Sequence, residues 1–359
     1  MAGKMKAVVI HAPGEYALEE VDIPKPKRGE VLVKIRAIAI CGSDPGIFAG
    51  RVRANGWPPC YPFVAGHEFA GEVVEIGESV TVLRPGDRVS GEAHCGCGVC
   101  ENCKRGMYNL CLNYGNKEAG HRHYGHNTEG CYAQYQVYDQ KALSRMPDNV
   151  SFDEGTLVDT AGTALNALRL CGVVPGGNTV VIGPGPMGIS AMLIAKAMGS
   201  SVIMVGRGER LMFAGKLGAD ELIDYEKTGD PVLEVRRMTG GYGADQVIEA
   251  AGNTTAFLES VQMAKKGGQV AFISIPSEDG QSIAGKYLVM NQISLHGTRA
   301  NPNCSRHILH MISNGSLGTL KNMITHVFPI DQTREAFDTF IRRRDGAVKV
   351  LIHPFAEPA

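Results

Sequence analysis

Residues 178–197, NTVVIGPGPMGISAMLIAKA, decide the fold of the second half of the chain. The apolar run at 178–182 predicts a strand, and the apolar residues after the turn recur at helical spacing. Between them, Gly183, Gly185 and Gly188 form a G-x-G-x-x-G pattern, which permits a tight turn and close approach of a pyrophosphate to the backbone. By itself this pattern also fits a plain glycine-rich turn. Its position between a strand and a helix favours a dinucleotide site that includes Pro186 and Met187.

Further apolar runs follow this unit at regular intervals. SVIMVG, ELIDY, ADQVIEAAG, GQVAFISI and QISLHGT each predict a strand, and helical patterns separate several of them. This alternation is typical of an α/β fold with a doubly wound parallel sheet.

The hydrophobic pattern of the sequence is different before residue 155. Short β-rich runs such as EVLVKIRAIAI and GEVVEIG alternate with turns, which predicts a partly open barrel or sandwich. Short-strand patterning returns near the carboxyl end in VKVLIHP. We therefore expect a first domain at 1–155, an inserted dinucleotide-binding domain at 156–298, and a return to the first domain at 299–359.

Composition excludes several classes of protein. The chain has 359 residues, 44% of them hydrophobic, and a formal net charge of -1, so it can build conventional cores without disulfides. There is no basic run that predicts a nucleic-acid or membrane partner, and no apolar run of about 18 residues that predicts a membrane span. The amino-terminal stretch lacks the apolar region of a secretory signal, so a cytoplasmic location is expected.

Ten cysteines in a reducing compartment point to metal binding or catalysis and not to disulfides. Cys97, Cys100, Cys103 and Cys111 have the spacing C-x2-C-x2-C-x7-C within a lobe at 94–112, and Gly98 and Gly106 let the loop wrap round one ion. Four thiolates suit a closed, structural zinc site. Two alternatives remain for this site: Cys95 could replace Cys97 as a ligand, or the four cysteines could be free thiols. The other cysteines are expected to be small core residues: Cys60, Cys131, Cys171 and Cys304.

The end of the second predicted strand bears on the choice of coenzyme. NAD enzymes usually carry an acidic residue there for the ribose 2′-hydroxyl, whereas this strand ends in Gly206 and Arg207. Gly206 leaves room for a 2′-phosphate, and Arg207 could pair with it, which favours NADP. The alternative is an arginine that stacks on the adenine or points into water.

Taken in order, GHEFAGEVVEIGESV, PGDRV, the four-cysteine lobe and GPGPMG resemble the zinc-dependent medium-chain dehydrogenases, in the branch of sorbitol, threonine and secondary-alcohol dehydrogenases. The resemblance covers essentially the whole chain. It implies a GroES-like β-rich catalytic domain with an inserted Rossmann-type domain. It also implies an enzyme that transfers hydride between a secondary alcohol or polyol and NAD(P), with two zinc ions per chain, and a homotetramer or homodimer.

Carried over to this chain, the resemblance makes Cys41 and His67 ligands of a catalytic zinc. It offers Asp159 as the third ligand, although a carboxylate there also suits the start of a helix, and Glu68 as a nearby fourth group. Ser43 would pass the substrate proton outward. Many relatives have a histidine shortly after this position, but this chain has Asp44, Pro45 and Gly46, so Asp44, Thr160 or water remain open as the outer relay.

Two loops, residues 46–62 and 113–130, are expected to border the substrate pocket by the same resemblance. The second loop contains His121, Arg122, His123 and His126, and Arg299 follows the last predicted strand, so an anionic group on the substrate is one hypothesis. The alternatives are that this loop is a solvated surface or a subunit contact, and that the substrate is a neutral polyol or small secondary alcohol. We also expect Arg299 to contact the coenzyme.

Two rival classes are weighed against the dehydrogenase. A zinc-free reductase of the quinone-reductase kind shares the domain plan but should lack Cys41, the His67–Glu68 pair and the cysteine lobe. A thiol-based redox or metal sensor would need exposed, reactive cysteines in the cluster.

Overall fold

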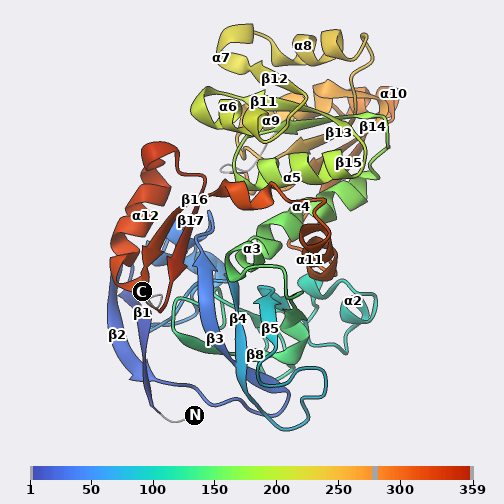
Figure 1. The fold of residues 1–359 in the computed structure, drawn as a ribbon. Coiled ribbons are helices and arrows are strands. Elements are labelled where there is room, and N and C mark those ends of the chain that lie inside the picture. Colours follow the sequence, from blue (N-terminus) through green and yellow to red (C-terminus); the bar gives the residue numbers. More distant parts are fainter. Residues whose placement is uncertain (1–2, 277–281, 356–359) are drawn as a thin grey trace. The chain divides into compact units, whose positions relative to one another are not determined.

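The computed structural model describes residues 3–276 and 282–355, and Figure 1 shows the course of the chain. The contacts divide the chain into two compact units. Unit 1 comprises Met1–Asp159, Ser305–Gly315 and Met323–Ala359, and unit 2 comprises Thr160–Cys304 and Ser316–Asn322.

Unit 2 contains a six-stranded sheet in the order β12-β11-β10-β13-β14-β15, in which all neighbouring strands are parallel. In chain order this is 3-2-1-4-5-6, the arrangement of doubly wound dinucleotide-binding folds, so the predicted α/β class is confirmed. The order reverses between β10 and β13, and ligands of such sheets bind at the carboxyl edge of this point. The strands are β10 Asn178–Ile182, β11 Ser201–Gly206, β12 Glu221–Asp224, β13 Ala244–Glu249, β14 Ala264–Phe272 and β15 Ser294–Gly297.

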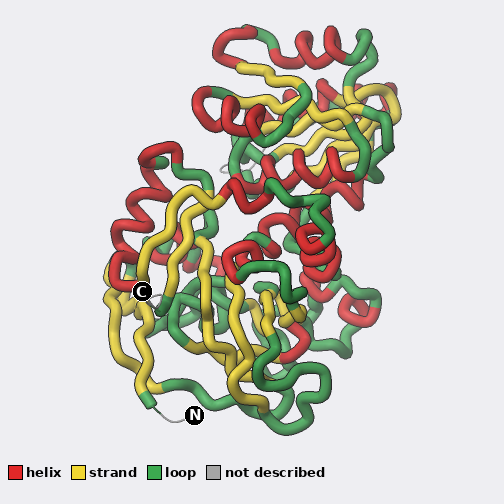
Figure 2. The backbone as a smooth tube through the Cα atoms, in the orientation of Figure 1, coloured by secondary structure: helices red, strands yellow, loops and turns green. Residues whose placement is uncertain are grey.

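Helices connect and pack against these strands, as the tube in Figure 2 shows. The predicted helix after the glycine turn is α5, Pro186–Ala197, whose residues from Gly188 to Ala195 are all buried. It is apolar on every side because it packs against β10, β11 and β13. The other helices are α4 Val158–Cys171, α6 Gly208–Lys216, α7 Tyr225–Thr228, α8 Pro231–Met238, α9 Thr254–Met263 and α10 Gly285–Asn291.

Unit 1 is built on a seven-stranded sheet, β16-β17-β3-β4-β5-β9, with β8 paired to β3. The carboxyl-terminal β17 pairs antiparallel with β3, so the red and blue ends of the chain lie side by side in Figure 1. The last strand of the chain thus belongs to the sheet of unit 1. The strands are β1 Lys4–Ala12, β2 Glu15–Asp22, β3 Glu30–Ala39, β4 Glu68–Ile76, β5 Arg88–Gly91, β6 His94–Cys95, β7 Arg122–His123, β8 Tyr135–Asp139, β9 Leu143–Arg145, β16 Ile324–Pro329 and β17 Lys349–His353.

Short helices join these strands. Among them α3 begins with a capping box, in which Ser151 and Glu154 each accept from the other's backbone N–H. The helices of unit 1 are α1 Asp44–Phe48, α2 Glu101–Lys104, α3 Phe152–Thr156, α11 Ser305–Ser313 and α12 Thr333–Arg342. The 3-10 turns of the chain are η1 Arg53–Asn55, η2 Tyr108–Leu110, η3 Gln140–Ala142, η4 Leu320–Met323, η5 Ile330–Gln332 and η6 Arg344–Gly346.

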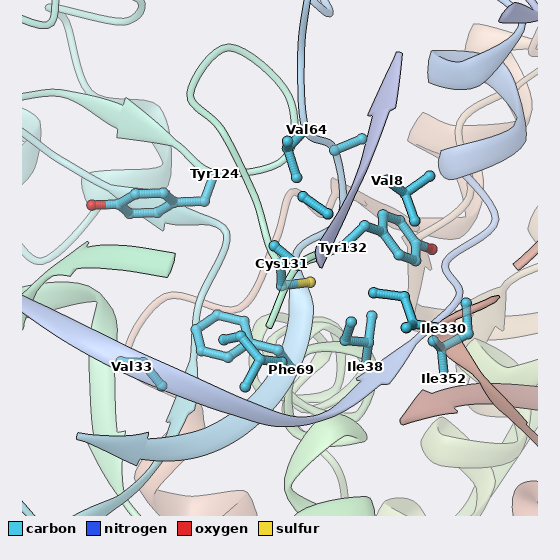
Figure 3. Close-up of a cluster of buried hydrophobic side chains, with 14 of the residues drawn as sticks. Val8, Val33, Ile38, Val64, Phe69, Tyr124, Cys131, Tyr132, Ile330 and Ile352 are labelled. Carbon is cyan, nitrogen blue, oxygen red and sulfur yellow. The ribbon is translucent and has the colours of Figure 1, made fainter. Parts of the chain in front are cut away.

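The core of unit 1 combines the inner faces of these strands, and Figure 3 shows part of it. Phe69 stacks on Tyr138 with ring centroids 4.3 Å apart. A Cβ at Gly91 would lie 2.1 Å from the Phe69 ring, so only glycine fits at the end of β5. This packing fixes the strand ends from which the functional side chains project.

In the part of the chain that the structure describes, no helix is both long enough and apolar enough to cross a lipid bilayer.

Candidate functional site

Three side chains predicted to act together meet where β3 and β4 pair. Cys41 follows the end of β3, His67 precedes β4, and Glu68 is the first residue of β4, opposite Ala39. One potential ligand atom from each of these three residues lies within 4.8 Å of the other two. A thiolate, an imidazole and a carboxylate in such a group suit a zinc ion.

Asp44 holds two of these groups in place. It is fully buried, and its Oδ2 accepts the backbone N–H of Cys41 at 2.8 Å and the hydroxyl of Tyr132 at 2.7 Å. Its Oδ1 lies 3.6 Å from Nδ1 of His67, which leaves Nε2 of the ring for a metal. A carboxylate behind a ligating histidine is a common outer partner in metal sites. Because Asp44 is buried and its carboxylate already binds Cys41 and Tyr132, it is disfavoured as the residue that relays the substrate proton to solvent.

Lys349 is a partner of Glu68 that the sequence did not reveal. Its Nζ forms an ion pair with Oε2 of Glu68, and both side chains are only 2% exposed. Lys349 begins β17, and the pairing of β17 with β3 brings it here. Burial would lower the pKa of Lys349, but the nearby Glu68 and Cys41 raise it, so the ammonium form is favoured.

Asp159 lies in the first turn of α4 and outside the group of three. Burial raises its pKa to about 6, with a further contribution from Glu68, while His67 and the backbone N–H of Ala93 act in the opposite direction. Burial lowers the pKa of His67, but Cys41, Asp44 and Asp159 together raise it well above its usual value. Cys41, Asp44 and Asp159 can each carry a negative charge near His67. A divalent cation bound here would offset these charges.

The Ser43 hydroxyl lies at the start of α1, beside this group. Its Oγ is buried, and no group within residues 3–276 and 282–355 hydrogen-bonds to it. A buried hydroxyl without a protein partner is available to a substrate oxygen or a water.

The four lobe cysteines lie together as predicted from their spacing. Sγ of Cys97 is 3.9 Å from Sγ of Cys103, and Sγ of Cys100 is 4.0 Å from that of Cys111. These distances exclude disulfide bonds. They approach the edge of about 3.8 Å that four sulfurs form round a zinc at about 2.3 Å.

Backbone and side-chain donors in the lobe stabilise thiolate. The N–H groups of Val99 and Cys100, each at 3.4 Å, and the amide of Asn113 at 3.3 Å donate to Sγ of Cys97. Although burial alone raises the pKa of Cys97, these donors lower it to about 6. The lobe residues therefore fit a tetrahedral zinc site.

The other cysteines behave differently. Cys95 is buried outside the group of four, and burial raises its pKa to about 12, so it is not placed to exchange with Cys97. Cys131, Cys171 and Cys304 are buried as expected, whereas Cys60 is exposed.

The glycine turn of unit 2 has the geometry of a phosphate cradle. Gly183 has a φ of +101°, and a Cβ at Gly188 would lie 2.0 Å from the carbonyl oxygen of Gly183, so both positions require glycine. A Cβ at Gly185 would meet nothing within 4 Å, which leaves open space at the start of α5. No side chain caps this helix, and Pro186 and Met187 form its first turn. The turn therefore offers an uncapped helix amino terminus and open space to an anion.

The residues considered for the 2′-phosphate lie at the end of β11. A Cβ at Gly206 would lie 2.5 Å from Pro184, so packing against the glycine turn already requires glycine here. The Arg207 side chain is 60% exposed, pairs with Glu226, and lies over the ring of Tyr225. Arg299 follows β15, whose carboxyl end lies on the same edge of the sheet.

The histidines of the 113–130 loop form a buried stack that extends from the zinc-ligand candidate His67. The ring of His126 lies 4.7 Å from that of His67, and His123 stacks on His126 at 3.8 Å and on His94 at 3.9 Å. His121, His123 and His126 are 0%, 4% and 5% exposed, so the interpretation as a solvated surface is wrong for them.

Both predicted pocket loops contribute to this stack. Trp57 packs edge-on against His126 at 4.8 Å, and its Nε1 donates to the hydroxyl of Tyr114. Arg122, by contrast, donates to the carbonyl oxygens of Lys117 and His121, at 2.7 and 2.9 Å. These bonds within its own loop disfavour Arg122 as the receiver of an anionic substrate.

Two family models and several known proteins match the chain. Residues 27–148 match the family model described as "Alcohol dehydrogenase GroES-like domain", and residues 186–314 match the one described as "Zinc-binding dehydrogenase". The sorbitol dehydrogenase of Bacillus subtilis is 30% identical over 98% of this chain and 97% of its own. The L-threonine 3-dehydrogenase of Bacillus licheniformis is 33% identical over 99% of this chain and 100% of its own.

Solved structures share the whole fold. A proposed zinc-binding dehydrogenase from Sinorhizobium meliloti 1021, bound to NADP, has a TM-score of 0.87 and 27% identity, covering 98% of this chain and 100% of that one. A short chain alcohol dehydrogenase from Escherichia coli CFT073, complexed with NADH, has a TM-score of 0.88 and 27% identity, covering 98% and 99%.

Proposed function

Since the chain belongs to the zinc-dependent medium-chain dehydrogenase family, and is thus an oxidoreductase of alcohols or polyols with a nicotinamide coenzyme, we propose that it acts through two zinc ions on a neutral secondary alcohol or polyol. The observation that carries this proposal is the group formed by the half-buried Cys41 and the buried His67 and Glu68, whose potential ligand atoms lie within 4.8 Å of one another. Its chemistry fits a catalytic zinc, and that of the four lobe cysteines fits a structural one.

In the proposed catalytic site, Cys41, His67 and Asp159 would hold the zinc, with Glu68 as the nearby fourth group. When bound, this ion acts as a Lewis acid that favours loss of the alcohol proton and polarises the carbonyl in the reverse direction. Asp44 orients His67 for this task, and Lys349 keeps the charge of Glu68 balanced in the interior.

Ser43 is proposed to move the proton. Its buried Oγ accepts the proton of the substrate hydroxyl and passes its own proton to water, because Asp44 is already committed to Cys41 and Tyr132. Once bound, the nicotinamide ring would supply the redox chemistry as the hydride acceptor. The glycine turn and the start of α5 would bind the pyrophosphate of that coenzyme, and Arg299 is retained as a further coenzyme contact.

NADP is the proposed coenzyme. Arg207 is exposed and its pair with Glu226 is a surface ion pair, which is worth little and can give way to a phosphate. There is no acidic residue at the end of β11 to repel that phosphate.

The substrate is proposed to be neutral because Arg122 is already engaged by carbonyl oxygens. The half-buried Trp57 and the buried His123 and His126, beside His67, have the polar edges expected for a hydroxylated substrate. We also propose a cytoplasmic homotetramer or homodimer, since the unpaired edge of β15 in the described sheet is open to a second copy.

The test is a substrate screen with the metal-loaded protein. Secondary alcohols, polyols, their phosphates and hydroxy acids are offered with NADP and with NAD, and coenzyme reduction is followed by absorbance. We expect turnover of neutral alcohols that is lost in Cys41→Ser. Reduction of quinones by a protein without zinc would favour the zinc-free reductase class, and release of zinc by mild oxidant without any turnover would favour the sensor.

A further inference from the structure

Glu92 is a buried carboxyl group that the proposed reaction does not use. It follows β5 and is 6% exposed. Its Oε2 accepts the hydroxyl of Tyr108 at 2.5 Å, and its Oε1 accepts the hydroxyl of Ser305. Within residues 3–276 and 282–355 no cation forms an ion pair with it. A buried carboxyl group without a cation is costly, so its retention calls for an explanation.

The two donors come from segments far apart in the sequence. Tyr108 begins η2 in the cysteine lobe, between Cys103 and Cys111. Ser305 is the first residue of α11, where a carboxylate is favoured by the helix dipole. Glu92 therefore joins the lobe and α11 to the end of β5.

The next residue in the chain, Ala93, faces the proposed catalytic site. Its backbone N–H donates to the carboxylate of Asp159, and this bond lowers the pKa of that group. Its carbonyl oxygen accepts the N–H of Tyr124 at 2.8 Å, and the N–H of Glu92 donates to the carbonyl of Ala142. The hydrogen bonds of the Glu92 side chain to Tyr108 and Ser305 thus hold the Glu92–Ala93 peptide in place. The N–H of this peptide in turn binds the carboxylate of Asp159.

We propose that Glu92 is a positioning residue, which sets the place of Asp159 by anchoring the Ala93 peptide to Tyr108 and Ser305. This inference rests on the proposed role of Asp159 as a ligand of the catalytic metal. It also assigns a task to the cysteine lobe, which contains no reacting group: through Tyr108 the lobe helps to fix a ligand of the other site.

The test deletes the two hydroxyl groups one at a time. Tyr108→Phe and Ser305→Ala each remove one bond to Glu92, and Tyr242→Phe, at a tyrosine that is 77% exposed in unit 2, is the matched control. Zinc content, the visible spectrum of Co²⁺ loaded into the Cys41 site, kcat and the KM of the coenzyme are measured. We expect both zinc ions to be retained, the cobalt spectrum to change, and kcat to fall about tenfold with an unchanged coenzyme KM, as when an outer partner of a metal ligand is lost.

Substitution of Glu92 itself distinguishes hydrogen bonding from charge. In Glu92→Gln the amide still accepts from one hydroxyl and donates to the other, so this variant should recover most of the activity and spectrum lost in Glu92→Ala. Should Glu92→Ala fail to fold, the two hydroxyl deletions still decide the matter. A cobalt spectrum and kcat unchanged in both of them would overturn the proposal. Absence of turnover or of catalytic-site metal in the unmodified protein would instead reject the proposed function.

Discussion

The ammonium group of Lys349 forms a buried ion pair with the carboxylate of Glu68, although β4 and β17 are far apart in the sequence. The pair lies in unit 1 beside Cys41, whose charge also acts on Lys349. Because both groups are buried, removal of one leaves an uncompensated charge in the interior.

Lys349→Met should therefore lower the free energy of unfolding by about 3 to 5 kcal/mol, measured by urea denaturation. The double variant Lys349→Met/Glu68→Gln should recover most of this loss because no charge remains unpaired. Lys4→Met is the control, since its pair with Asp22 is exposed and should contribute less than about 1 kcal/mol. A loss in Lys349→Met no greater than that in Lys4→Met would show that the buried pair is not a stabilising contact.

Asp44→Asn should weaken zinc binding at the Cys41 site. The amide keeps at most one oxygen for the N–H of Cys41 and the hydroxyl of Tyr132, and it removes the negative charge 3.6 Å from Nδ1 of His67; loss of such an outer partner typically costs about 10- to 100-fold in metal affinity. Competition with a chelator measures the change. Asp87→Asn is the matched control, because Asp87 is also buried but bonds to Arg84 and Arg145. Equal zinc affinity in the two variants would contradict the role given to Asp44.

Glu92 should make stability depend on pH. Burial raises its pKa from 4.5 to about 7, despite the hydroxyls of Ser305 and Tyr108, so between these values the folded protein binds a proton that the unfolded chain has lost. This contribution to stability is present below about pH 4.5 and is lost as pH rises to about 7.

Relative to Glu92→Gln, the unmodified protein should thus lose up to about 3 kcal/mol of unfolding free energy between about pH 5 and pH 8. Urea denaturation across this range measures the difference. Glu101→Gln, an exposed position in the cysteine lobe, should show no such trend. A difference between the unmodified protein and Glu92→Gln that is independent of pH would refute this assignment.

Arg207→Ala should change the choice of coenzyme. If Arg207 leaves Glu226 to pair with a 2′-phosphate, the variant should lose about tenfold or more in kcat/KM with NADP and little with NAD. Arg237→Ala serves as control, since Arg237 also pairs with a nearby glutamate, Glu234, on an exposed helix surface. Equal losses of kcat/KM with NADP and NAD would mean that Arg207 does not bind the 2′-phosphate.

The parts of the fold that the sequence predicted are those with local causes. Gly183 has a φ of +101°, and a Cβ at Gly188 would meet the carbonyl oxygen of Gly183, so the need for glycine at both positions has a cause within the turn and its pattern is visible in the sequence. The four lobe cysteines lie within fifteen positions, 97 to 111, so their spacing alone brings them together. Helix α5, the strands of the unit 2 sheet, and β3, β4 and β17 of unit 1 were predicted from their apolar patterns.

The parts that could not be predicted depend on long-range pairing. Lys349 reaches Glu68 only because β17 pairs with β3, and Glu92 meets Ser305 only through the return of α11 to unit 1. The loop histidines are polar, which suits a surface, but His123 and His126 are buried in ring contacts: they stack on each other, and His126 also contacts Trp57 edge-on and His67 at a tilt. Cys41 and His67 were identified by resemblance to a family, because isolated residues carry no spacing signal.

The most direct test of the account is the zinc content of the purified chain and three variants, measured by elemental analysis. We predict about two zinc ions per chain in the unmodified protein and in Cys95→Ala, and about one in Cys41→Ser and in Cys100→Ala. Only Cys41→Ser should lose turnover while keeping the stability of the lobe. The account is contradicted if Cys41→Ser retains two zinc ions and full turnover, because Cys41 would then not be a ligand of the catalytic metal.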